Sequence, residues 1–159
     1  MVDSDTFRQV MGNFAAGVTV VTLPDPAHGI TVNAFASVSL DPPLVLVCLD
    51  HDSEAFRRFE EGADRFCVNV LAADQRHLGE YFANMGDLET DPFETEATRT
   101  AATGAPVFED AIAYLDCTVA ASHEAGDHTI YVGSVEDAAI QRADAPALTY
   151  FRGGWGSFE

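Results

Sequence analysis

A double proline interrupts residues 29–50, GITVNAFASVSLDPPLVLVCLD, and this break constrains the fold more than any other feature of the sequence. Proline has no backbone N–H and restricts the residue before it, so a regular strand or helix does not continue through residues 41–43. Both flanking segments are rich in residues that favour extended structure. The sequence therefore predicts one strand over residues 30–40 and another over residues 44–50.

The first of these segments alternates as a strand with two different faces does. One face is predicted to pack in the core and consists of Val32, Ala34, Ala36, Val38 and Leu40. The other carries short polar groups and one aromatic ring, from Thr31, Asn33, Phe35, Ser37 and Ser39. No charged residue occurs between Gly29 and Leu40, although acidic residues are plentiful elsewhere. The polar face is either a ligand-binding face or a half-solvated one, and the alternation by itself favours neither.

The second segment, LVLVCLD, is apolar without alternation, which is typical of a strand buried on both faces. We therefore expect residues 44–50 to lie inside the molecule. The strand before it is then the one that borders a site.

The remaining segments predict a mainly β protein. Strands are expected over residues 18–23, 66–71 and 147–151, and AIAYLDCTVAASHEA and HTIYVGSVEDAAI are expected to form a hairpin around Gly126 and Asp127. Helices are expected over residues 3–16, from Ser53 to Gly62, and from Asp74 through Phe82. Residues 85–106 show no period, and a loop of that length is often a lid or a subunit arm. Strands joined by short turns, with accessory helices, indicate an antiparallel barrel, which a glycine-rich tail, RGGWGSFE, follows.

Length and charge limit the class of protein. The 159 residues, 47% of them hydrophobic, suit a single domain spanning residues 1–159. The formal net charge is -18, and all eight basic residues are arginines. The negative electrostatic field of such a chain repels nucleic acids and anionic membrane surfaces, so neither is an expected partner. Molar salt shortens the screening length to about 3 Å and relieves this self-repulsion, which suggests a halophile's cytoplasm.

The cysteines and the N-terminus point to the same compartment. Cys48, Cys67 and Cys117 lie far apart in apolar segments and form no paired spacing, so we expect buried thiols. The first residues, MVDSDTFRQV, are polar and acidic, unlike a secretory leader, and no apolar run is long enough to span a bilayer. A reducing, cytoplasmic environment is therefore expected.

Few residues have the spacing of a catalytic or metal site. The five histidines lack ligand spacing, no serine lies in a GxSxG elbow, and GGWG is not a dinucleotide-binding loop. Residues 50–53 end a strand and begin a helix, so they form either an anion site or a plain helix cap. His128 lies beside a hairpin turn, where it is either functional or solvated.

Four segments occur in an order that resembles the flavin reductase-like family: GITVNAFASVSLDPPLVLVCLD, FCVNVLAADQRHLGEYFA, GDHTIYVGSV and PALTYFRGGW. The likeness extends from about Phe7 to Trp155. This family consists of small NAD(P)H-dependent reductases of FMN or FAD that supply two-component monooxygenases. The resemblance implies an FMN-binding split barrel of Greek-key type, a homodimer with flavin near the subunit interface, and hydride transfer from nicotinamide to flavin.

The resemblance also implies the residues of the site. The flavin ring edge and ribityl chain would contact Thr31, Asn33, Ala34, Ser37, Val38 and Ser39. The ribityl and phosphate groups would lie along Leu49, Asp50, His51 and Ser53. Phe82 would form a wall, and Tyr150 and Trp155 would close the site. His128 matches the family histidine on the nicotinamide side and is the catalytic candidate; no metal ligand is implied. The family often carries a basic residue near the tail's aromatics, and this tail offers only Arg152.

The same barrel supports other functions, so alternatives stay open. A non-catalytic flavin-binding electron carrier and a ferric reductase are the main ones, followed by an oxidase, a deazaflavin-dependent reductase or a plain interaction module. Both FMN and FAD, and both NADH and NADPH, remain candidates.

Overall fold

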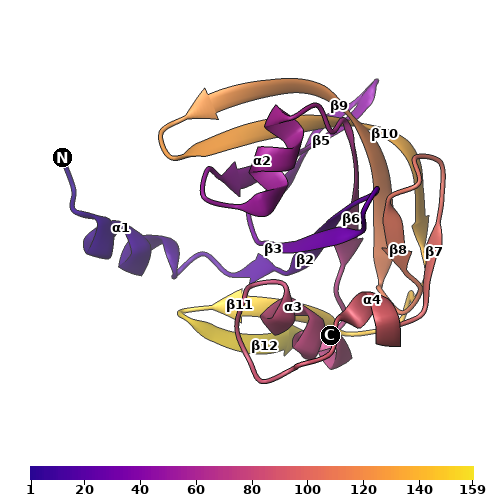
Figure 1. The fold of residues 1–159 in the computed structure, drawn as a ribbon. Helices are drawn as coiled ribbons and strands as arrows, with labels where there is room; N and C mark the ends of the chain where they lie inside the picture. Colours follow the sequence, from indigo (N-terminus) through magenta and orange to yellow (C-terminus); the bar gives the residue numbers. More distant parts are fainter.

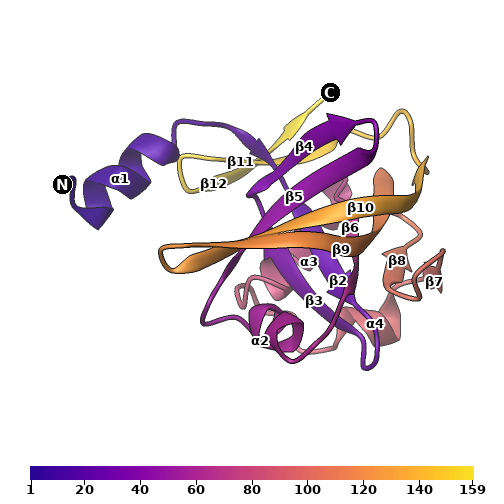
Figure 2. The ribbon, with the colours of Figure 1, turned by 90° about the horizontal axis from the view of Figure 1, so that it is seen from above.

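A seven-stranded antiparallel sheet forms the body of the molecule in a computed structural model that describes residues 1–159. Its spatial order is β3, β2, β6, β9, β10, β5, β4. The strands are β2 (Thr19–Leu23), β3 (His28–Val32), β4 (Phe35–Leu40), β5 (Pro43–Asp50), β6 (Arg65–Val70), β9 (Ala113–Ala125) and β10 (His128–Ile140). The two edge strands, β3 and β4, are consecutive in the chain, so the sheet curls until its edges meet at residues 33–34 (Figures 1 and 2). The predicted antiparallel split barrel is confirmed.

Two smaller sheets and several short helices surround this barrel. The small sheets contain β1 (Ala16–Gly17), β11 (Ala147–Phe151) and β12 (Gly154–Phe158), and β7 (Thr98–Thr100) with β8 (Pro106–Phe108). The helices are α1 (Ser4–Met11), α2 (Glu54–Glu60), η1 (Ala73–Gln75), α3 (Arg76–Tyr81) and α4 (Pro92–Thr95). Helix α1 extends away from the body at the N-terminus, while α3 lies beside the β11–β12 hairpin (Figure 1). No helix has both the length and the hydropathy that crossing a membrane requires.

Strand β2 separates two hydrophobic clusters and is buried along its whole length. Val21 and Leu23 belong to the cluster inside the barrel, which is built around Phe59 and Phe66. Val20 belongs to a second cluster, between the sheet, α3 and the β11–β12 hairpin. The β-branched run of residues 18–23 therefore suits a central strand, as the sequence predicts.

The predicted strand over residues 30–40 is wrong in one respect, because it is two strands that meet at a corner. β3 ends at Val32 and β4 begins at Phe35. The bend reverses the faces: Phe35 packs against the barrel core, whereas Ala34 and Ala36 are exposed. Leu40, predicted as core, is 95% exposed.

Four further expectations are corrected. In β5 one face is buried, through Val45, Val47 and Leu49, but the opposite face is only half-buried, so the strand is not enclosed on both sides. The N-terminal helix ends at Met11 and buries none of its residues. Residues 85–106 contain α4 and β7, and the glycine-rich tail pairs with β11 as β12. The predicted helix from Ser53, the strand near 66–71 and the hairpin around Gly126 are confirmed.

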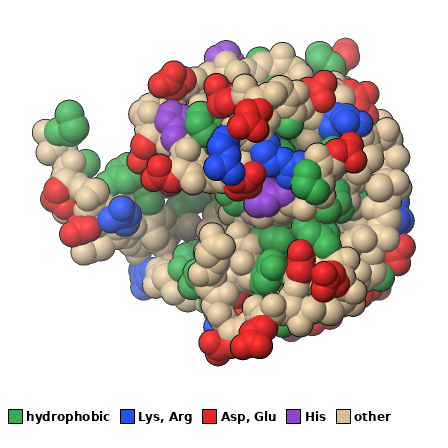
Figure 3. Space-filling view, in the orientation of Figure 1, with side chains coloured by type: hydrophobic (Ala, Val, Ile, Leu, Met, Phe, Trp, Pro, Cys, Tyr) green, Lys and Arg blue, Asp and Glu red, His purple; other side chains and the backbone are tan.

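Acidic side chains are spread over the face seen in Figure 3, and arginines gather over α2. Of the three free cysteines, Cys67 and Cys117 are buried, as expected, and Cys48 is half-buried.

Candidate functional site

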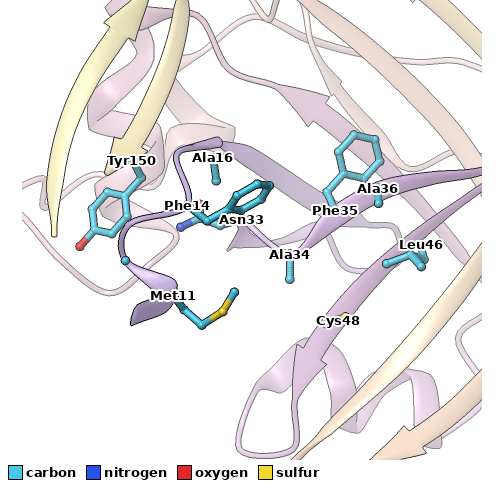
Figure 4. A pocket seen from close by; sticks show the side chains of 11 residues that line it. Met11, Phe14, Ala16, Asn33, Ala34, Phe35, Ala36, Leu46, Cys48 and Tyr150 are labelled. Atoms are coloured by element: carbon cyan, nitrogen blue, oxygen red, sulfur yellow. The ribbon is translucent and has the colours of Figure 1, made fainter. Parts of the chain in front are cut away.

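A cavity of about 450 Å³ lies where the corner between β3 and β4 meets β5 and the N-terminal segment. Nine of its eleven lining residues are apolar. The lining consists of Met11, Gly12, Phe14, Ala16, Asn33, Ala34, Phe35, Ala36, Leu46, Cys48 and Tyr150. Figure 4 shows Tyr150, Phe14 and Met11 on one side of this cavity and Leu46 and Cys48 on the other, with Asn33 and Ala34 between them.

Backbone hydrogen bonds hold the corner at residues 33–34 against β5. The Phe35 N–H donates to the Asn33 carbonyl at 3.0 Å, and the Cys48 N–H donates to the Ala34 carbonyl at 3.1 Å. No hydrogen bond within the chain uses the N–H groups of Asn33 and Ala34 or the Asn33 side-chain amide. Free polar groups thus border an otherwise apolar cavity, an arrangement typical of a ligand site.

The opposite wall comes from the tail hairpin and the segment after α1. Tyr150 in β11 pairs with Ala16 in β1, which places both side chains on one face. At the hairpin turn the Arg152 N–H donates to the Gly12 carbonyl at 2.8 Å, and its Nε donates to Asn13 Oδ1 at 2.8 Å. These bonds fix the segment that carries Met11 and Phe14.

His128 lies on the same side of the sheet as the cavity. In the antiparallel register Ile130 pairs with Cys48 and His128 pairs with Asp50, so the imidazole is on the face that carries Cys48. His128 is two residues from Ile130, the residue opposite Cys48, which corresponds to about 7 Å along the strand. Its Nδ1 lies 2.7 Å from Asp127 Oδ1, and this hydrogen bond lowers the pKa of the Asp127 carboxyl below its usual value. The bond fixes the imidazole beside Asp127 at the start of β10.

The residues just before α2 form hydrogen bonds with one another and with its first turn. The Asp52 N–H donates to Asp50 Oδ1 at 2.7 Å, and the Ser53 N–H donates to the Asp50 carbonyl at 3.0 Å. Ser53 Oγ accepts from the Phe56 N–H at 3.1 Å, which is the bond of a helix N-cap. The geometry is that of a capped helix.

Of the residues expected in the site, Asn33, Ala34 and Tyr150 line the cavity together. Thr31 Oγ1 donates to the Gly79 carbonyl, and Ser37, Val38 and Ser39 continue along β4 beyond the lining. Leu49 faces the core, so only its backbone is available, and Asp50, His51 and Ser53 lie at the start of α2. Phe82 packs in the second cluster, and Trp155 packs there against Tyr150 with ring centroids 5.0 Å apart.

Met11, Phe14, Leu46 and Cys48 line the cavity although the sequence did not identify them. The first two belong to an apolar helical face that resembles a core face, and the last two belong to a uniformly apolar run. The one feature of the sequence that could have identified these four residues is that both segments carry more apolar residues than a single buried face can accommodate.

Only two titratable side chains, Cys48 and Tyr150, line the cavity. Burial raises the pKa of the Cys48 thiol, which keeps it neutral. The cavity therefore does not supply acid–base or nucleophilic chemistry of its own. Its apolar walls and free N–H groups fit a flat ring system with hydrogen-bonding edges, as the flavin ring is.

Comparison with known proteins agrees with this geometry. Residues 11–159 match the family model described as the flavin reductase like domain. A flavin reductase of Pseudomonas putida is 38% identical over 160 residues, covering 99% of this chain and 91% of the relative. The HsaB reductase subunit of a Mycobacterium tuberculosis flavin-dependent monooxygenase is also 38% identical, covering 99% of this chain and 84% of the relative.

Among solved structures, the NADH:FAD oxidoreductase SgcE6 of Streptomyces globisporus, in complex with NAD and FAD fragments, superposes with a TM-score of 0.88. It shares 36% identity, and the match covers 100% of this chain and 96% of that one. The resemblance drawn from the sequence is thereby confirmed. The chain belongs to the flavin reductase like domain family.

Proposed function

We propose that this chain is an NAD(P)H-dependent flavin reductase that transfers a hydride from a nicotinamide to FMN or FAD bound in the cavity at the β3–β4 corner. The observation that carries the proposal is the corner itself, where the unpaired N–H groups of Asn33 and Ala34 border an apolar cavity. The related reductases named above support the same reaction.

The protein's part in this reaction is binding and orientation. The flavin supplies the hydride-accepting chemistry when it is bound, which explains why the cavity lacks an acid–base pair. Ala34 and Ala36 leave room for a flat ring against the backbone, and Leu46 and Met11 exclude water from it. The N–H groups of Asn33 and Ala34 are fixed donors that favour developing negative charge on the ring.

The experiment that tests this function follows NADH oxidation by the purified chain with and without added FMN or FAD. Turnover that requires added flavin supports the reductase. Flavin that copurifies near 1:1 and is not turned over supports the alternative, a bound-flavin electron carrier.

We also propose that two copies of the chain form a homodimer that completes the site. None of the residues of α1 is buried: Phe7 and Val10 on the helix are 56% and 64% exposed, and Phe14, which follows it, is 74% exposed. Covering such an apolar face in a second copy stabilises the dimer by removing it from water. Met11 and Phe14 belong to both this face and the cavity, so the partner would close the flavin site.

The reduced flavin would serve a monooxygenase, since one close relative is the reductase subunit of such an enzyme. We place this reaction in the cytoplasm, where the nicotinamide donor is available.

Replacing His128 with glutamine is expected to raise the KM for NADH about tenfold. A hydrogen bond to a charged group contributes about 1.5–3 kcal/mol, and His128 would lose one such contact with the donor. The measurement is steady-state NADH oxidation at saturating flavin, together with the flavin Kd, which should not move. His77→Gln is the control, since His77 lies on α3, where its Nε2 is 2.8 Å from Glu96 Oε1, and it is not on the strand that carries His128. An unchanged KM would remove His128 from the nicotinamide side.

High salt is expected to stabilise the chain and to lower its KM for NADH. With a net charge of -18, the acidic side chains repel one another and also repel an anionic dinucleotide. Molar salt screens charges beyond about 3 Å and weakens both effects. The checks are the urea midpoint and the KM, each in dilute buffer and in molar KCl. A urea midpoint that stays constant would contradict the halophilic interpretation.

A further inference from the structure

A second cavity, of about 620 Å³, follows the first along the same two chain segments. The first cavity is lined by Asn33, just after β3, and by Cys48 in β5. The second is lined by residues 28–30 of β3 and by residues 52–54, which follow β5. Three strand residues span about 10 Å, a distance that suits the ribityl chain of a flavin whose ring lies at the corner. The group at the end of that chain would therefore reach the second cavity.

This second cavity is lined by carboxylates and by no lysine or arginine. Asp52, Glu54 and Asp91 line it, and His28 is its sole basic residue. Burial, and then the charge of Arg58, lower the pKa of His28, which favours the neutral imidazole. A phosphate placed here meets negative charge on several sides.

Two arginines, Arg57 and Arg58, lie on α2, whose first residue borders this cavity. Arg57 forms an ion pair with Glu54. Arg58 Nη2 donates to the carbonyls of Pro24 and Pro26, which holds it at the β2–β3 turn. The N–H groups of Asp52 and Ser53 are also bonded within the chain. The guanidinium groups of both arginines are thus engaged within the chain and are not free to bind a phosphate.

We propose that this reductase recognises the ring and ribityl chain of its flavin and not the phosphate, so that uncharged riboflavin is a substrate bound at least as tightly as FMN. The inference rests on the proposed flavin site and specifies its substrate class. It also agrees with the charge of the whole chain, which disfavours anionic ligands in dilute buffer.

The test compares the Kd of riboflavin and FMN, which differ only by the phosphate, by fluorescence quenching in dilute buffer. Riboflavin binding as tightly as FMN, or more tightly, supports the proposal, and FMN binding more tightly overturns it. A parallel NADH oxidation assay keeps the two claims separate. Absence of turnover with every flavin would refute the reductase function, whereas the order of the two Kd values judges the phosphate alone.

Two variants locate the effect. Asp52→Asn with Glu54→Gln is expected to tighten FMN relative to riboflavin about fivefold, because two unit charges near the phosphate are removed. Glu109→Gln with Asp144→Asn removes the same charge elsewhere on the surface and should leave that ratio unchanged. An equal change in both double variants would show that Asp52 and Glu54 do not act on the phosphate locally and would overturn the proposal.

A third variant, Arg152→Gln, tests whether the phosphate binds instead to Arg152, whose N–H contacts Gly12 in the lining of the first cavity. A loss of FMN affinity relative to riboflavin in that variant would place the phosphate at the tail hairpin and overturn the proposal.

Discussion

Replacing Ala34 with phenylalanine is expected to weaken flavin binding at least about 100-fold, equivalent to about 2.8 kcal/mol. Ala34 lies at the corner that separates β3 from β4, is exposed, and lines the apolar cavity. A phenyl ring at this position occupies the volume that the flavin ring needs and covers the unpaired N–H groups of the corner. The Kd is measured by fluorescence quenching with riboflavin, whose neutral charge avoids any effect of the phosphate.

The fold should survive this substitution because the side chain points out of the core. The free energy of unfolding, measured by thermal unfolding followed by circular dichroism, is expected to change by less than about 0.5 kcal/mol, as for most exposed positions. Ala139→Phe is the matched control, since Ala139 is exposed on β10 and does not line the cavity. Retained affinity in Ala34→Phe would mean that the flavin ring binds elsewhere, and the proposed function would lose its site.

Much of the fold is predictable because its signals are local. The β-branched run before Leu23, the turn at Gly126 and the cap at Ser53 each act within a few residues, and each is where the sequence places it. The barrel class follows from strands joined by such turns.

The corner between β3 and β4 is not predictable in this way. Neither Asn33 nor Ala34 interrupts the alternation, so residues 30–40 resemble one continuous strand. The bend is stabilised by the bond from the Cys48 N–H to the Ala34 carbonyl, which depends on a strand that comes later in the chain. A tertiary contact thus decides the local geometry, and it turns Ala34 and Ala36, predicted as core, toward the cavity.

The site shows the same division between local and distant information. Asn33 and Ala34 could be identified because they occupy a charge-free polar segment, and Tyr150 because of the family resemblance. Leu46 and Cys48 could not, because an unbroken apolar run conceals which of its faces is buried. An apolar face on α1 is expected to pack in its own core, yet here it remains open beside the cavity. The proposed homodimer would cover this face.

Barrel closure makes one position far more sensitive than its sequence context indicates. Gly133 lies in β10 between Val45 of β5 and Val119 of β9. A Cβ at Gly133 would lie 2.5 Å from the Phe66 ring and 3.0 Å from the Cys117 Cβ, both of which are fully buried. Gly133→Val is therefore expected to destabilise the chain by about 3 kcal/mol, because a close-packed core cannot move aside. Urea unfolding in molar KCl measures this loss with the surface charges screened.

Gly17→Val is the matched control for Gly133→Val, since Gly17 is also a strand residue but has no atom within 4 Å of its added Cβ. Its expected effect on the free energy of unfolding is below about 0.5 kcal/mol. Adding Phe66→Leu to Gly133→Val should recover part of the loss, because the shorter side chain vacates the space that valine needs, and a double-mutant cycle isolates that coupling. Equal destabilisation by the two glycine variants, or no recovery with Phe66→Leu, would show that backbone flexibility and not the contact with Phe66 accounts for the glycine.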